Sequence, residues 1–137
     1  MTLKVATAPN VLAGTTFTYM VPGHQRWVLR SVFAVADRGA GGTPNRSYTL
    51  TITDGTNPVA IVGADDAGTD PGTCSVTWAD CPSSAVGAGS VGTSVGSLGP
   101  ITLDPGYTIT GTFANPVAGD AWESAVVWFD YVDTGQQ

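Results

Sequence analysis

Apolar and polar residues alternate along most of this chain, as they do in β-strands that bury one face. The stretch "SYTLTITDGTNPVAIVG" is the clearest case, because Tyr48, Leu50 and Ile52 alternate with threonines. A Gly-Thr-Asn-Pro sequence then separates this run from a second apolar one. Turn residues between two alternating runs are typical of a β-hairpin. The pattern therefore predicts paired strands over 47–53 and 58–62.

The same alternation predicts about eight strands, each bounded by turn residues. Besides the hairpin they cover 16–21, 26–35, 74–78, 101–103, 107–113 and 122–132, and a short additional strand fits 3–7. No window shows convincing helical spacing. We therefore predict an all-β fold, an antiparallel β-sandwich that is jelly-roll-like. The alternative is an immunoglobulin-like sandwich, whose core cysteines usually lie further apart than Cys74 and Cys81.

Strict alternation also assigns faces to the two longest strands. It predicts that Trp27, Leu29, Phe33 and Val35 share one face of the strand over 26–35. The strand over 122–132 is apolar on both faces, and Trp122 and Trp128 are expected to share a face with Val126. One face of that strand should lie in the core, and the other should be covered by loops or by another subunit.

The length of 137 residues suits a single domain spanning 1–137. The stretch "SSAVGAGSVGTSVGSLG" at 83–99 is rich in Gly and Ser, which predicts an internal loop or arm. It is either an extended arm ordered by a neighbouring subunit or a mobile surface loop, and a structureless loop of this length is uncommon in a compact domain.

Charge is sparse, with 12% charged residues and a net charge of −6. An acidic chain is not expected to bind nucleic acid, which requires clustered Lys and Arg. Four arginines, Arg26, Arg30, Arg38 and Arg46, fall in one region. They either meet an acidic partner surface or are ordinary solvated arginines, and we favour the second interpretation.

The N-terminus lacks the pattern of a signal peptide, and no apolar run is long enough to cross a bilayer. We therefore expect synthesis in the cytoplasm and no membrane partner.

Candidate catalytic chemistry is scarce. His24 is the only histidine and follows a Pro-Gly turn, no G-x-S-x-G motif occurs, and Glu123 is the only glutamate. The sole lysine, Lys4, follows no phosphate-binding glycine loop. The sequence predicts neither an enzyme nor a cofactor.

Metal binding has one weak candidate, a calcium site formed by Asp65, Asp66 and Asp70. A solvated acidic loop is the more economical interpretation. Cys74 and Cys81 lack zinc spacing, so they form either a local disulfide or two thiols, and a reducing compartment favours thiols.

Four segments carry a family resemblance: Val21–Leu29, Asn45–Asn57, Pro105–Thr110 and Ala118–Trp122. They match, in order and over most of the chain, a pattern of "vPaGkrWrllsv", "NR…l.itDGtn", "pPGyti.t" and "aGDqw". This pattern is similar to that of small structural proteins encoded by tailed bacteriophages. The matching motifs consist of turn and core-strand residues, so they indicate a class of protein rather than a site.

The resemblance implies a β-rich virion protein without enzymatic activity. Within that class we expect a capsid decoration, or cement, protein on the outer capsid surface. Its partner would be the major capsid protein, and it would form a homo-oligomer, with a trimer as the expectation. The last strand supplies the candidate subunit contacts Trp122, Trp128, Phe129 and Tyr131.

Two other functions are compatible with this reading. One is a structural module of a tail or head fibre. The other is a carbohydrate-binding module for host attachment, which requires an exposed aromatic platform.

Overall fold

The computed structural model describes residues 2–6, 11–39, 46–66, 72–79 and 92–133. Those residues form eleven strands and no helix. The strands are β1 (Thr2–Ala6), β2 (Val11–Ala13), β3 (Thr16–Met20), β4 (Gln25–Arg38), β5 (Arg46–Thr53), β6 (Pro58–Asp66), β7 (Gly72–Ala79), β8 (Gly92–Ser97), β9 (Ile101–Leu103), β10 (Thr108–Ala114) and β11 (Ala121–Asp133).

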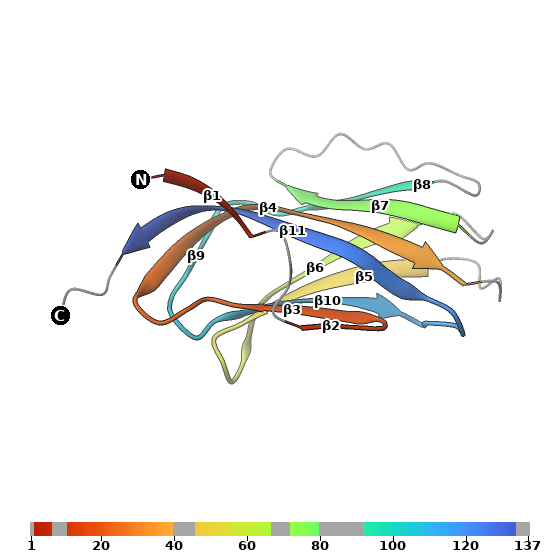
Figure 1. Ribbon diagram of the computed structural model, residues 1–137, viewed down its shortest axis with the longest axis horizontal. Helices are drawn as coiled ribbons and strands as arrows, with labels where there is room; N and C mark the ends of the chain where they lie inside the picture. The colour runs from red at the N-terminus through yellow and green to blue at the C-terminus, as the bar shows by residue number, and fades with distance from the viewer. Residues whose placement is uncertain (1, 7–10, 40–45, 67–71, 80–91, 134–137) are drawn as a thin grey trace.

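The strands form two sheets that face each other (Figure 1). The six-stranded sheet has the order β1-β11-β4-β7-β8, and β9 pairs with the first half of β4. The five-stranded sheet has the order β2-β3-β10-β5-β6. All pairs are antiparallel except β7 with β8, which is parallel. The chain is therefore an antiparallel β-sandwich, as its alternating pattern predicts.

The connectivity is that of a jelly roll. When the short strands β2, β8 and β9 are set aside, eight strands remain. The predicted set differs from these, since it counts β9 among its eight strands and β1 as an addition. Of the eight that remain, the six-stranded sheet contains β1, β4, β7 and β11, and the five-stranded sheet contains β3, β5, β6 and β10. The chain thus passes repeatedly between the sheets, and the last long strand, β11, lies beside the first, β1.

Part of the Gly/Ser-rich segment is a strand rather than a loop. Residues 92–97 form β8, which pairs in parallel with β7 along its whole length. A Cβ on Gly96 would lie 2.4 Å from Cδ1 of Trp78 and 2.6 Å from the carbonyl oxygen of Gly63. Only glycine therefore fits between β7 and β6 at this point. The remainder of the expected arm, 83–91, lies outside the described residues.

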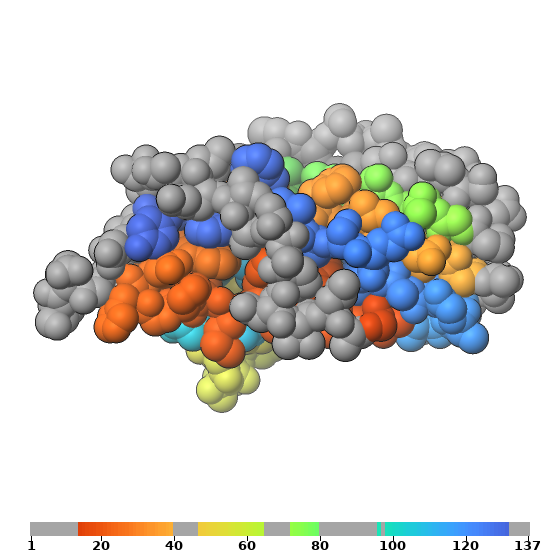
Figure 2. Space-filling model, viewed as in Figure 1, coloured from red at the N-terminus to blue at the C-terminus, as the bar shows by residue number. Residues whose placement is uncertain are grey.

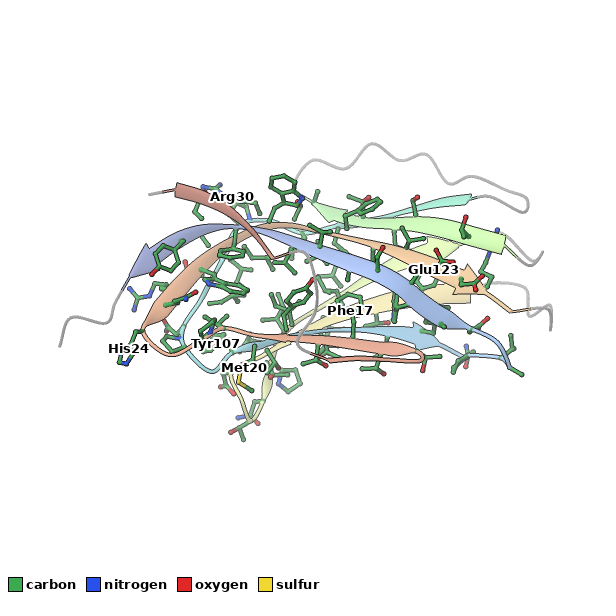
Figure 3. The ribbon with its side chains drawn as sticks, in the orientation of Figure 1. Phe17, Met20, His24, Arg30, Tyr107 and Glu123 are labelled. Carbon is green, nitrogen blue, oxygen red and sulfur yellow. The ribbon has the colours of Figure 1, made fainter. Side chains whose placement is uncertain are left out.

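The core fills the space between the sheets. Phe17 and Tyr19 of β3 alternate with threonines, and so do Tyr48, Leu50 and Ile52 of β5. Trp78, Trp122 and Phe113 complete an aromatic centre (Figure 3 shows Phe17 pointing into it). These burials follow the alternation of each strand, because successive side chains point to opposite faces.

Two β-bulges change the faces of the two longest strands. In β4 the pairing with β11 skips Arg30, because Ser31 lies opposite Trp128 and Leu29 opposite Phe129. In β11 the same pairing skips Glu123, because Trp122 lies opposite Ala36 and Ser124 lies opposite Val35. An extra residue moves every later side chain to the other face.

The predicted faces of these strands are therefore wrong. Beyond Arg30, Val32 and Ala34 are buried, whereas Phe33 points away from the side that buries Trp27 and Leu29. Val35 follows Phe33 on that outer side. Trp122 likewise lies in the core, while Val126 and Trp128 lie on the outer side.

Turns account for most of the motifs behind the family resemblance. Gly106, with a φ of 89°, follows Pro105 in the turn that is closed by Tyr107 N–H donating to the carbonyl of Asp104 at 3.1 Å. The buried carboxylate of Asp120 accepts N–H groups from Gly39 at 2.7 Å and Val117 at 2.9 Å. That carboxylate ties two loops together at one end of the sandwich.

The turn of the β5–β6 hairpin projects beyond both sheets (Figure 2). The Asp54 carboxylate accepts the N–H groups of Asn57 at 2.7 Å and Thr56 at 2.9 Å. The hydrogen bond from Asn57 lowers the pKa of Asp54 most, and the hydrogen bond from Thr56 lowers it further. The predicted hairpin is thus present, with its aspartate closing the turn.

Candidate functional site

The four arginines do not form one basic patch. Arg26 pairs with Asp104 at 2.7 Å, and Arg30 pairs with Asp130. Arg38 is buried, with only 2% of its surface exposed, because the bulge at Arg30 turns it inward. It is therefore not a surface contact, contrary to expectation. The side chain of Arg46 lies outside the described part of the chain.

Two of the expected contact residues on the last strand are also core residues. Trp122 is 4% exposed, and Phe129 stacks on Trp27 with ring centroids 3.7 Å apart. Tyr131 is half-buried against the core. Of the four aromatic residues proposed on this strand, Trp128 is the one with a large exposed surface, at 39%. Since β11 lies between β1 and β4, neither of its edges is open for pairing along these contacts.

The candidate calcium ligands do not come together in the part of the chain that the structure describes. Asp65 and Asp66 are the last residues of β6, where they pair with Ser47 and Arg46. Asp70 lies outside the described ranges. No group of three or more His, Cys, Asp or Glu residues that could hold a metal ion occurs among the residues searched.

The remaining chemistry-bearing residues are placed as follows. His24 is exposed at the β3–β4 turn with a φ of 67° (Figure 3). Cys74 is buried in β7, and Cys81 lies outside the described residues. No helix in the described ranges is long and apolar enough to cross a membrane.

The outer face of the five-stranded sheet carries a regular array of threonines, here called the threonine face. Its members are Thr16, Thr18, Thr49, Thr51, Thr53, Thr108, Thr110 and Thr112. The register aligns them in rows across three strands: Thr110 lies opposite both Thr18 and Thr51. Thr112 lies likewise between Thr16 and Thr49. The hydroxyl groups of Thr53 and Thr108 are 2.6 Å apart and share a hydrogen bond.

Exposed apolar residues border the threonine face. Met20 occupies the place of a ninth threonine opposite Thr108 and is 53% exposed. Ile61, opposite Thr51 on the edge strand β6, is 64% exposed, and Val59 on the same strand is 46% exposed. Among the described side chains on this face, none is charged. A surface whose described side chains are uncharged and include protruding aliphatic groups is typical of one that another molecule covers.

A second surface, the aromatic patch, lies on the outer face of the six-stranded sheet. It consists of Phe33 and Val35 of β4 and Val126 and Trp128 of β11. Phe33 is 37% exposed, and its direct partner across the strands is Val126. Trp128 lies two residues further along β11. The two bulges are what place these side chains outside rather than in the core.

An ion pair borders the aromatic patch. Asp130 follows Trp128 on the outer side of β11, and its Oδ2 accepts hydrogen bonds from Nε of Arg30, at 2.8 Å, and from Nη2. Arg30 is the bulged residue of β4 and lies on the outer side of the sheet (Figure 3). The patch therefore combines two exposed rings with a fixed acceptor and a fixed donor.

Sequence reasoning missed Phe33 and most of the threonine face as surface candidates. Thr-x-Thr repeats at 16–18, 49–53 and 108–112 were a usable signal for the latter. No comparable signal marks Phe33, because alternation alone places it in the core.

Tyr19 links the two sheets through a buried hydrogen bond, in which its hydroxyl donates to the Ala125 carbonyl at 2.7 Å. Burial raises the pKa of Tyr19 from 10.0 to about 12. The native state holds this proton more tightly than the unfolded state does. The contribution of Tyr19 to the free energy of unfolding is therefore complete below about pH 10 and is lost as the pH rises to about 12.

We therefore expect the free energy of unfolding to fall over that alkaline window. Tyr19→Phe should remove this part of the pH dependence while costing about 1 kcal/mol at neutral pH, the typical worth of one hydrogen bond. Urea unfolding at a series of alkaline pH values measures both effects. An identical alkaline loss in the variant would contradict the assignment to Tyr19.

Comparisons with known proteins assign this chain to no family. No protein-family model matches the chain, and no curated protein matches it. One similar solved structure is dimeric latent PorU from Porphyromonas gingivalis, with 12% identity and a TM-score of 0.42, covering 96% of this chain and 12% of that one. Another is the CBM35 from Cellvibrio japonicus Abf62, with 13% identity and a TM-score of 0.31, covering 94% of this chain and 82% of that one.

This chain thus spans about an eighth of the length of the PorU chain. At TM-scores of 0.42 and 0.31, neither similarity bears on the function of this chain. Neither of these two structures is a phage structural protein.

Proposed function

We propose that this protein is a non-enzymatic structural protein of a tailed-phage particle. In this proposal it is a capsid decoration protein that docks through the threonine face. The four turn and strand motifs shared with small phage virion proteins support the choice of particle. The rigid two-sheet framework supports a role in which the fold presents a surface rather than a reactive centre.

One observation carries the proposal: the described side chains of the threonine face and its border are uncharged, and Met20, Val59 and Ile61 are exposed there. The chain carries a net charge of −6, yet no described side chain on this face is charged. Charged side chains are depleted where a protein surface is desolvated by a partner. Half-buried threonines offer methyl groups for packing and hydroxyl groups that exchange donors and acceptors with a neighbouring backbone.

The mechanism is mass action. A protein that binds the assembled shell and not the free subunit stabilises the shell by its binding free energy. Each molecule spanning more than one capsid subunit would oppose their separation. A homotrimer at a symmetry axis of the capsid would multiply this effect, because linked copies bind with a high effective concentration.

Thr110→Lys tests the docking face, because Thr110 occupies the central row of the threonine face. Burying an unpaired ammonium costs several kcal/mol, so binding to purified, expanded, empty capsids should weaken by about 100-fold or more. Co-sedimentation with the capsids gives the affinity and the number of copies per shell. The melting temperature should stay close to that of the wild type, because Thr110 points away from the core.

Thr102→Lys is the matched control. It introduces the same charge on β9, at an exposed position of the six-stranded sheet. Capsid binding should be unchanged in this variant. Wild-type protein that fails to bind capsids, and is retained by tails or fibres instead, would replace decoration with the fibre alternative. Equal loss in both variants would refute docking through the threonine face. Light scattering of the free protein tests the trimer separately.

A further inference from the structure

We propose that the aromatic patch is a saccharide-binding platform, in which Trp128 and Phe33 stack on sugar rings and the Arg30–Asp130 pair binds their hydroxyl groups. This inference concerns the outer face of the six-stranded sheet. It does not depend on what the threonine face binds.

The two rings are close enough to contact one ligand. Phe33 lies directly opposite Val126, and Trp128 is two residues further along the same strand, so the two aromatic residues are diagonal cross-strand neighbours. Diagonal positions are about 7–8 Å apart, within reach of a single extended ligand. Val126 lies between them, so the apolar surface is continuous.

Their exposure is unusual for this molecule. The other three tryptophans, Trp27, Trp78 and Trp122, are buried. Trp128 is 39% exposed and Phe33 is 37% exposed. The bulge at Glu123 places Trp128 on the outer side of β11, and the bulge at Arg30 places Phe33 on the outer side of β4. Bulges are over-represented beside functional sites because they redirect side chains.

The polar groups at the edge of the patch are already oriented. Asp130 uses Oδ2 to accept both hydrogen bonds from Arg30. Oδ1 of Asp130 and Nη1 of Arg30 form no hydrogen bond with another described residue. A hydrogen-bond acceptor on Asp130 and a donor on Arg30 therefore lie side by side, and Asp130 is two residues beyond Trp128 on β11.

This combination identifies the ligand class. A sugar ring has one apolar C–H face that packs on an aromatic ring, whose π face is electron-rich. Its hydroxyl groups both donate and accept hydrogen bonds. They can therefore donate to a carboxylate and accept from a guanidinium at the same time. Because the two charges cancel, a neutral saccharide fits better than an anionic or a cationic one. The open sheet face, rather than an enclosed pocket, suits an extended oligosaccharide.

The two sheets present the two surfaces on opposite sides of the sandwich (Figure 1). A molecule docked through the threonine face would leave the aromatic patch pointing away from the surface to which it is bound. Both interactions are therefore sterically compatible in one molecule.

Titration calorimetry with cellohexaose, maltohexaose, chitohexaose and a purified neutral bacterial cell-wall polysaccharide tests the platform. We expect saturable binding of at least one of these probes. Trp128→Ala and Phe33→Ala should each weaken it by about ten-fold or more, as for central contacts of an interface. Trp128→Phe should retain part of the affinity, and Asp130→Asn should weaken binding without unfolding the protein.

Acrylamide quenching of tryptophan fluorescence supplies an independent reading. Trp128 is the exposed tryptophan, so the bound saccharide should reduce quenching in the wild type and have no such effect in Trp128→Phe. Ile61→Ser, on the opposite face, is the control and should bind saccharide normally. Thermal melting of every variant separates loss of binding from loss of fold.

Absence of saturable binding to all four probes would overturn the proposal. Binding that survives Trp128→Ala, or that Ile61→Ser abolishes equally, would overturn it as well. Capsid binding by Trp128→Ala should match that of the wild type, so failure here and failure of the decoration function are distinguishable.

Discussion

Replacing Trp122 with alanine should destabilise the protein by about 3–5 kcal/mol, as for other buried large aromatic residues. Trp122 contacts four aromatic rings, those of Phe113, Phe17, Tyr48 and Trp78, at centroid distances of 4.9, 5.0, 5.4 and 6.4 Å. Its indole N–H donates to the Thr15 carbonyl at 3.0 Å. Truncation therefore opens a cavity between the two sheets and leaves that carbonyl with the longer hydrogen bond from the Phe113 N–H, at 3.3 Å.

Denaturant unfolding followed by far-UV circular dichroism measures the loss without relying on tryptophan fluorescence. Trp128→Ala is the matched control, because it deletes the same side chain from the same strand on the outer face. We expect it to cost about 1 kcal/mol or less, since substitutions at exposed sites are usually mild. A larger loss for Trp128→Ala than for Trp122→Ala would contradict the bulge at Glu123 that separates their faces.

Gly111→Val should destabilise the fold by about 3 kcal/mol or more, the upper range for overpacking a core. Gly111 lies opposite Phe17 in the five-stranded sheet and faces the core. A Cβ at this position would lie 2.1 Å from Cε2 and 2.3 Å from Cζ of Phe17. Phe17 is itself buried against Tyr19 and Trp122, so its ring has little room to move.

Gly63→Val is the control for this substitution. Gly63 lies on β6 of the same sheet, where an added Cβ meets nothing within 4 Å. A β-branched residue suits an exposed strand position, so this variant should be as stable as the wild type or slightly more stable. Phe17→Leu should partly rescue Gly111→Val by making room. Additive losses in the double variant would show that the clash is not with Phe17.

The local chemistry of the sequence was sufficient to predict most of the fold. Alternation along 47–53 and 107–113 predicts strands whose threonines face outward, and these strands have that arrangement. Turn residues such as Pro105 and Gly106 predict the breaks between strands. These features are readable because each depends on residues within one strand or turn.

Strands with weak local signals were not predicted. β2 has three residues, and β8 consists of Gly, Thr, Ser and Val, a composition typical of a linker. β8 forms because its backbone hydrogen bonds to β7 and because Gly96 fits against Trp78. Both causes are contacts with distant residues.

The candidate surfaces likewise depend partly on patterns within single strands and partly on contacts between distant residues. The outward threonines of three strands are predictable from the sequence, because alternation within one strand needs no knowledge of neighbours. The pairing of β3, β10 and β5, which joins residues far apart in the sequence, is what places those threonines in rows. Pairing between strands also turns Phe33 and Trp128 outward and buries Arg38 and Trp122. The cause is the pair of bulges at Arg30 and Glu123, which belong to the register between β4 and β11 and reverse the faces of the residues beyond them in each strand.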